Sequence, residues 1–160
     1  MVISCFSFTE MAKRAAKLMP HGGAMLTLTY GGSTRVMPNY NVMGVAKAAL
    51  EASVRYLAYD FGDRNIRVNA ISAGPVRTLA GSGVADARLM FNYQKKNSPL
   101  RRSVSIEEIG NTAVYLLSNL GSAVTGEIHF VDAGYNIVSM PHLAELKELE
   151  TPEEANQAAE

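Results

Sequence analysis

The stretch Ala24-Met-Leu-Thr-Leu-Thr-Tyr30 decides the fold, because its side chains alternate with a period of two. This pattern predicts a β-strand that ends at Gly31-Gly32. A helical pattern of apolar side chains then covers about residues 41–61, and Ile66-Arg-Val-Asn-Ala-Ile71 is a second strand, broken by the following Ser-Ala-Gly-Pro. Two strands joined by a long helix need a crossover connection, so we expect the strands to be parallel.

The other segments extend the same alternation of helices and strands. Apolar side chains at helical spacing predict a helix over residues 8–19, before Pro20, and residues 76–102 are expected to form a partly helical loop of the kind that binds ligands. A capping box at Ser105 opens a helix to about residue 118, and Glu127–Val131 is a third strand. The predicted fold class is α/β, a partial doubly wound parallel sheet.

Composition restricts the classes of partner. The 160 residues are 48% apolar and 19% charged, and fifteen basic side chains balance fifteen acidic ones. A formal net charge of zero argues against a nucleic acid or an anionic membrane as a partner. One cysteine and three scattered histidines have no metal-ligand spacing, so no metal site is expected. The sequence shows neither a secretory signal nor an apolar run long enough to cross a membrane, which favours the cytoplasm.

Ligands of open α/β sheets bind beyond the carboxyl ends of the strands, which here selects residues 29–35, 72–80 and 132–136. The first of these segments leads to Tyr40 and Lys47, which are seven residues apart. On a helix this is about two turns, so we expect both side chains on one face. A nearby ammonium favours the phenolate form of a tyrosine and makes its hydroxyl a better donor to a carbonyl oxygen.

A less specific interpretation of the same residues competes with this one. Lys47, Glu51 and Arg55 form a stripe of alternating charge, which is typical of a solvated helix face. The chain also has no dinucleotide fingerprint, because Asp86 stands where Gly81-Ser-Gly83 would need its third glycine. On spacing alone, the Tyr40 and Lys47 pair is weak support for a catalytic site.

Two longer runs decide between these interpretations by resemblance. Pro38-Asn-Tyr-Asn-Val-Met-Gly-Val-Ala-Lys47 and Asn69-Ala-Ile-Ser-Ala-Gly-Pro-Val-Arg-Thr-Leu79, together with Tyr30, resemble the enoyl-acyl-carrier-protein reductases of bacterial fatty-acid synthesis. That family is a divergent branch of the short-chain dehydrogenase/reductase superfamily, and the resemblance covers about residues 3–140. The commoner members of the superfamily place tyrosine and lysine four residues apart, and neither Met43 nor Gly44 creates that pair.

The resemblance implies a role for each site residue. Tyr40 would donate a hydrogen bond to the thioester carbonyl while hydride from NADH reaches the β-carbon, Lys47 would bind the nicotinamide ribose, and Tyr30 would line the acyl site beside Tyr40. Contacts to the nicotinamide and the pyrophosphate would come from Val76, Arg77, Thr78, Leu79 and Ala80. The acyl chain would contact Met43 and Met90. The implied partner is an acyl-carrier-protein thioester, and the implied assembly is a homotetramer.

The chain also departs from the family pattern, since nothing in it corresponds to the first strand and the glycine-rich turn that hold the adenosine half of the cofactor. We therefore expect residues 1–143 to represent the carboxyl-terminal half of a Rossmann-like reductase domain, followed by an acidic, disordered tail over residues 144–160. The strand at 24–30 would expose an edge, which predicts an oligomeric, aggregation-prone or poorly folded chain with NADH affinity no better than millimolar. Two alternatives stay open: a reductase of another enoyl or carbonyl substrate, and a non-catalytic relative that acts only by association.

Overall fold

A computed structural model of the protein describes residues 1–76 and 87–142. Its centre is a parallel sheet of three strands in the order β1-β2-β3, formed by β1 (Gly23–Thr29), β2 (Ile66–Ala73) and β3 (Ile128–Val131). Gly23 pairs with Ile66 at the start of β1 and β2, and Ala70 pairs with Ile128 where β3 joins. The predicted α/β class with parallel strands is confirmed.

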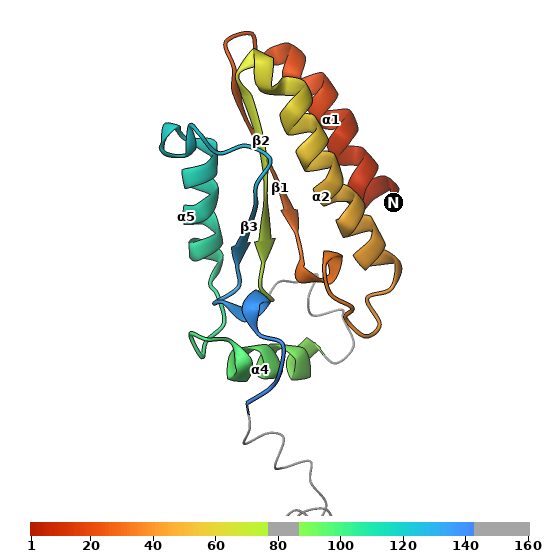
Figure 1. Ribbon diagram of the computed structural model, residues 1–160, viewed down its shortest axis with the longest axis vertical. Helices are drawn as coiled ribbons and strands as arrows, with labels where there is room; N and C mark the ends of the chain where they lie inside the picture. The colour runs from red at the N-terminus through yellow and green to blue at the C-terminus, as the bar shows by residue number, and fades with distance from the viewer. Residues whose placement is uncertain (77–86, 143–160) are drawn as a thin grey trace, which may run out of the picture.

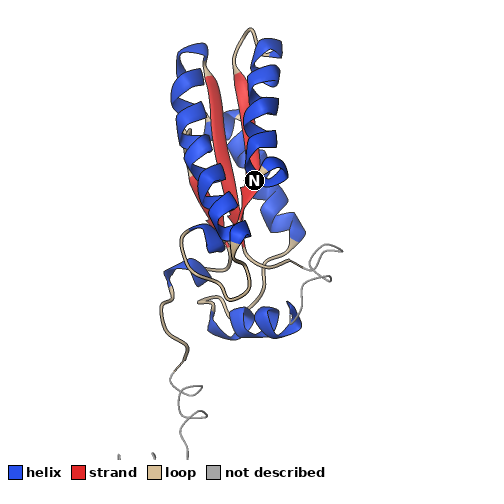
Figure 2. Cartoon of the chain, turned by 90° about the vertical axis from the view of Figure 1, so that its right-hand side faces the viewer, coloured by secondary structure: helices blue, strands red, loops and turns tan. Residues whose placement is uncertain are grey.

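Helices cover both faces of the sheet. In Figure 1, α1 (Ser7–Ala15) and α2 (Val42–Phe61) lie side by side on one face, and α5 (Ile106–Leu117) lies on the other. The remaining described helix, α4 (Ala87–Asn97), crosses below the carboxyl ends of the strands in both views (Figures 1 and 2). It falls inside the segment 76–102 that was expected to be partly helical. The chain thus places α4 where a ligand of this sheet would bind.

The core lies between the sheet and the pair of helices α1 and α2. Its buried members are all apolar: Ala12, Ala16, Met25, Val54, Leu57, Ala58, Ile66, Val68 and Ala70. The central strand β2 is buried along most of its length, as is usual for a parallel strand covered by helices on both faces. The strand continues to Ala73, although Ser-Ala-Gly-Pro predicts a break after Ile71, because Ser72 and Ala73 still pair with β3.

Two predicted helix boundaries are confirmed. Ser105 and Glu108 form the expected capping box, in which each side chain bonds to the other residue's backbone N–H. Helix α2 ends at Phe61, as expected, with Gly62 as its C-terminal cap residue. A short turn continues through Gly62 in a right-handed conformation, and Asn65 takes the left-handed one with a φ of 55°.

The apolar face of α2 is narrower than the sequence predicts. Leu50 and Val54 pack inward, whereas Val45 is 63% exposed and Tyr59 is 87% exposed. These outward side chains form an apolar surface that no other described segment covers. No helix in the described ranges 1–76 and 87–142 is long and apolar enough to cross a membrane. The predicted tail over 144–160 lies outside the described residues.

Candidate active site

The carboxyl ends of the three strands come together around one cavity of about 450 Å³ and a smaller neighbour. Tyr30 follows β1 directly, and Asp132 follows β3. The larger cavity is lined mostly by apolar and aromatic side chains, among them Tyr30, Met37, Tyr40, Met90, Tyr93 and Tyr135. The smaller one adds Ser72 and Gly74 from the end of β2 and Asp132 from the end of β3. Both cavities therefore lie at the edge of the sheet where the rule for open α/β sheets predicts that ligands bind.

Tyr30 and Tyr40 both line this cavity, and their rings pack against each other. Their ring centroids are 5.3 Å apart and the rings meet edge to face at 64°, a favourable arrangement for two aromatic side chains. Tyr40 does not lie on α2, as the helical spacing to Lys47 predicted, because it precedes the first helical residue, Val42. The neighbouring Asn39 and Asn41 have φ angles of 65° and 41°, so the chain turns there and does not continue the helix.

Two glycines allow the Tyr40 ring to lie where it does. A Cβ atom on Gly32 would lie 2.5 Å from Cδ1 and 2.7 Å from Cε1 of Tyr40. A Cβ atom on Gly44, in the first turn of α2, would lie 2.7 Å from the carbonyl oxygen of Gly32. Both approaches are closer than any real carbon contact, so each position requires glycine for a steric reason.

Burial controls the acidity of the two tyrosines. Loss of solvent around Tyr30, reinforced by Tyr40 and Tyr135, raises the pKa of Tyr30 to about 12, and burial also raises the pKa of Tyr40. The expectation that the Lys47 ammonium would favour a Tyr40 phenolate is therefore wrong, because burial moves the pKa of Tyr40 in the opposite direction. Both phenols stay protonated at neutral pH and can donate hydrogen bonds into the cavity.

Lys47 is held against the end of strand β1. Its Nζ donates a hydrogen bond of 2.9 Å to the carbonyl oxygen of Leu28. Burial lowers the pKa of Lys47, and the negative charge of Glu51 acts in the opposite direction. Glu51 itself is only 5% exposed, so the interpretation of Lys47, Glu51 and Arg55 as one solvated stripe is wrong at its middle residue.

The structure places the other predicted contact residues in three different surroundings. Met90 lines the larger cavity. Met43 lies outside that lining, next to the amino terminus, where its sulfur accepts a hydrogen bond from Ser4 Oγ at 3.8 Å. Val76 borders a separate cavity of about 480 Å³ between α4 and α5. Arg77, Thr78, Leu79 and Ala80 lie outside the described residues.

Sequence reasoning did not single out Arg35, which ties the tyrosine-bearing loop to the segment after β3. Its guanidinium donates to the carbonyl oxygens of Asn136 and Val138, the latter at 2.7 Å. Asp132 shapes that segment, since its carboxylate accepts from the backbone N–H groups of Gly134 at 3.0 Å and Asn136 at 2.8 Å. The sequence analysis selected residues 29–35 and 132–136 because they follow strands. These segments contain Arg35 and Asn136, but no sequence pattern predicted a hydrogen bond between them.

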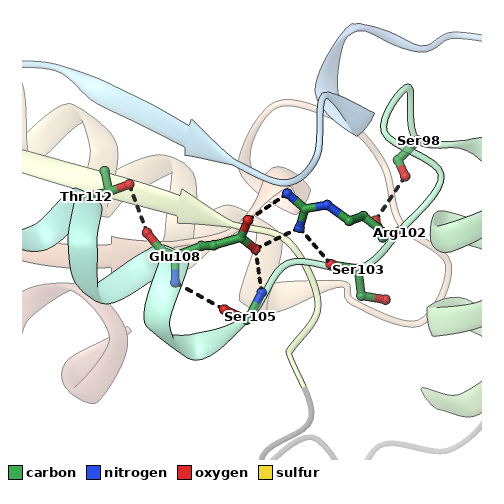
Figure 3. Close-up of polar contacts among 6 residues, drawn as sticks. All are labelled: Ser98, Arg102, Ser103, Ser105, Glu108 and Thr112. Carbon is green, nitrogen blue, oxygen red and sulfur yellow. Dashed lines mark hydrogen bonds and ion pairs between the residues drawn. The ribbon is translucent and has the colours of Figure 1, made fainter.

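A second polar cluster fixes the connection between α4 and α5 (Figure 3). Arg102 donates to both carboxylate oxygens of Glu108, at 2.6 and 2.8 Å, and Ser98 Oγ donates to the Arg102 carbonyl at 3.2 Å. The bonds from Arg102 and from the Ser105 backbone lower the pKa of Glu108 to about 2. Across residues 1–76 and 87–142, no three histidine, cysteine, aspartate or glutamate side chains gather closely enough to hold a metal ion.

Residues 1–136 match the family model described as "Enoyl-(Acyl carrier protein) reductase", which is most of the chain. The chain belongs to the enoyl-acyl-carrier-protein reductase family. A curated relative in Rhizobium meliloti (strain 1021), named Enoyl-[acyl-carrier-protein] reductase [NADH] 2, is 75% identical over 147 residues. This match covers 92% of the chain and 55% of the relative, so the chain spans about half the length of the curated relatives it matches.

Solved structures of this reductase family have the same fold over the shared region. The structure of FabI from Candidatus Liberibacter asiaticus is 67% identical, with a TM-score of 0.84 over 87% of this chain and 54% of that one. The reductase from Anaplasma phagocytophilum, solved in complex with NAD, is 57% identical, with a TM-score of 0.83 over 87% and 53%. The resemblance identified from the two sequence runs is confirmed.

Proposed function

We propose that this chain carries the catalytic side of a site that reduces the double bond of an enoyl thioester on acyl-carrier protein, with NADH as the reductant, in fatty-acid synthesis. The observation that carries the proposal is the pair of protonated phenols, Tyr30 and Tyr40, at one apolar cavity. Protonated donors at a cavity with a mostly apolar lining suit a carbonyl oxygen that gains negative charge during the reaction. Membership of the reductase family supports the same assignment.

The donor groups present fit the nicotinamide side of such a cofactor. Lys47 offers a partly buried ammonium beside the carboxyl end of β1, and an ammonium with three donors suits the hydroxyls of a ribose. When bound, a reduced nicotinamide supplies a hydride to the β-carbon of the substrate. We assign binding of the ribose to Lys47, and contacts to the nicotinamide and pyrophosphate to Val76, Arg77, Thr78, Leu79 and Ala80.

The cavity residues then act on the thioester. The Tyr40 hydroxyl donates to the thioester carbonyl and stabilises the enolate oxygen that forms there. Tyr30 packs against Tyr40 and closes the site on the side of β1, and Met90 contacts the acyl chain through its flexible apolar side chain. Met43, which the family resemblance also assigns to the acyl chain, would have to leave its place beside Ser4 to contribute.

We further propose that the chain works as a homo-oligomer, a tetramer by its family, in the cytoplasm. The exposed apolar side chains on the outer face of α2, including Val45, Tyr56 and Tyr59, support association through that helix. Association would bury them and raise stability with protein concentration. Size-exclusion chromatography coupled to light scattering tests this, and a monodisperse monomer with a cooperative melt would contradict it.

The test of the activity uses a chimera, in which this chain replaces the matching segment of the Rhizobium meliloti relative, because the chain spans 55% of that protein. NADH oxidation at 340 nm is followed with crotonyl thioester and, separately, with acetoacetyl thioester. Reduction of the crotonyl thioester alone is the expected result. Reduction of the acetoacetyl thioester in its place would assign the site to carbonyl chemistry and refute the proposal.

A further inference from the structure

Glu51 and Thr29 form a buried polar pair that the proposed reaction does not use. Their side chains are 5% and 4% exposed, and Thr29 Oγ1 donates a hydrogen bond of 2.7 Å to Glu51 Oε1. A buried carboxylate is costly unless charge or hydrogen bonds compensate it, so such a pair needs a physical reason. The hydrophobic cluster beneath α2 includes Val54, Leu57 and Ala58 of that helix.

Lys47, one helical turn before Glu51, gives a physical reason for the buried carboxylate. Lys47 and Glu51 are four residues apart on α2, so they share one face of the helix. Lys47 bonds to the carbonyl oxygen of Leu28, and Glu51 bonds to the hydroxyl of the next residue, Thr29. Two side chains of α2 are therefore hydrogen-bonded to Leu28 and Thr29, the last two residues of β1 before Tyr30.

We propose that Glu51, anchored by Thr29, is a positioning residue that places a negative charge one helical turn from Lys47 and so orients the Lys47 side chain against the end of β1, where the cofactor ribose would bind. This inference rests on the proposed function for the role of Lys47, but not for the contacts themselves. The groups that act on the Lys47 ammonium are the Glu51 carboxylate from its own helix and the Leu28 carbonyl from the strand.

The contribution that we assign to Glu51 is its negative charge. Burial favours the uncharged form of Lys47, and the carboxylate of Glu51 opposes that effect. Thr29 holds the carboxylate in place with one donor and leaves its negative charge available to Lys47. An amide at position 51 would keep a hydrogen bond to Thr29 but lose the charge.

The experiment measures the pKa of Lys47 in the 160-residue chain and, separately, in the chimera. Lysine carrying ¹³C at the ε position is titrated by NMR, and the Lys47 signal is assigned by its disappearance in Lys47→Arg. Glu51→Gln isolates the charge, Thr29→Val removes the anchor, and Thr29→Ser restores a hydroxyl. Asp60→Asn is the matched control, because it makes the same acid-to-amide change at an exposed position of α2.

We expect Glu51→Gln to lower the pKa of Lys47 below its value in the wild type, with Asp60→Asn leaving it unchanged. NADH binding, followed by fluorescence, should weaken about tenfold in Glu51→Gln and in Thr29→Val and recover in Thr29→Ser, because charge-assisted contacts are worth about that factor. A Lys47 titration that Glu51→Gln does not move would overturn the inference. Absence of NADH binding by the chimera, with the Lys47 shift intact, would instead count against the proposed function.

Discussion

Among the residues of the site without a functional side chain, Gly32 should be the one whose substitution lowers activity most. A Cβ atom added there would lie 2.5 and 2.7 Å from two carbons of the Tyr40 ring, whereas carbon atoms in contact prefer about 3.5 to 4.0 Å. Gly32→Ala must therefore displace the ring by about 1 Å. Gly31→Ala is the matched control, because its Cβ atom would meet nothing within 4 Å.

A displacement of about 1 Å in a catalytic group can reduce a rate by about 10²-fold. We expect kcat/KM for crotonyl thioester to fall by about that factor in Gly32→Ala and by less than about twofold in Gly31→Ala, both measured in the chimera. The Tyr40 ring is only partly buried, so the melting temperatures of the two variants should stay within a few degrees of each other. Equal kcat/KM values for Gly32→Ala and Gly31→Ala would refute the steric argument.

Three further predictions concern the cofactor contact, the core and the polar cluster. Lys47→Ala should weaken NADH binding in a fluorescence titration by at least about tenfold, since it removes a charged donor; unchanged affinity would exclude Lys47 from the cofactor site. Leu50→Ala should lower the free energy of unfolding in urea by about 2–5 kcal/mol, because Leu50 is 2% exposed, and a loss below that range would place it outside the core. The depressed pKa of Glu108, about 2, stabilises the fold above its ordinary value of 4.5, and this contribution is lost as the pH falls from 4.5 through about 2. Melting temperatures between pH 2 and 6 should therefore fall less steeply in Glu108→Ala, and parallel curves would contradict the assignment.

Most of the sheet and its flanking helices could be predicted because these elements have local signals, whereas α4 lies in a segment without a sustained period. Alternation over residues 24–30 marks β1, the apolar period over 41–61 marks α2, and Ser105 with Glu108 marks the start of α5. Each of these patterns lies within one short segment, so it can be recognised from the sequence alone. The parallel arrangement then follows from the order of the elements.

The details of the site depend on contacts between distant residues, which no local pattern encodes. Glu51 is buried because Thr29, 22 residues earlier, offers it a hydroxyl, and the alternating charges around it predicted an exposed side chain. Arg35 bonds to carbonyl oxygens about a hundred residues further along the chain. The position of Tyr40 did have a local signal, since Asn39 and Asn41 belong to a residue type that tolerates positive φ angles. That signal outweighs the helical spacing between Tyr40 and Lys47.

The most direct test of the account is the initial rate of NADH oxidation with crotonyl thioester by the chimera and its Tyr40→Phe variant, at equal concentrations of folded protein. The variant keeps the ring that packs on Tyr30 and loses only the hydroxyl. We expect the rate to fall by about 10²-fold or more, because one donor to a developing oxyanion is worth that much. A Tyr40→Phe variant as fast as the parent would contradict the claim that this phenol stabilises the enolate.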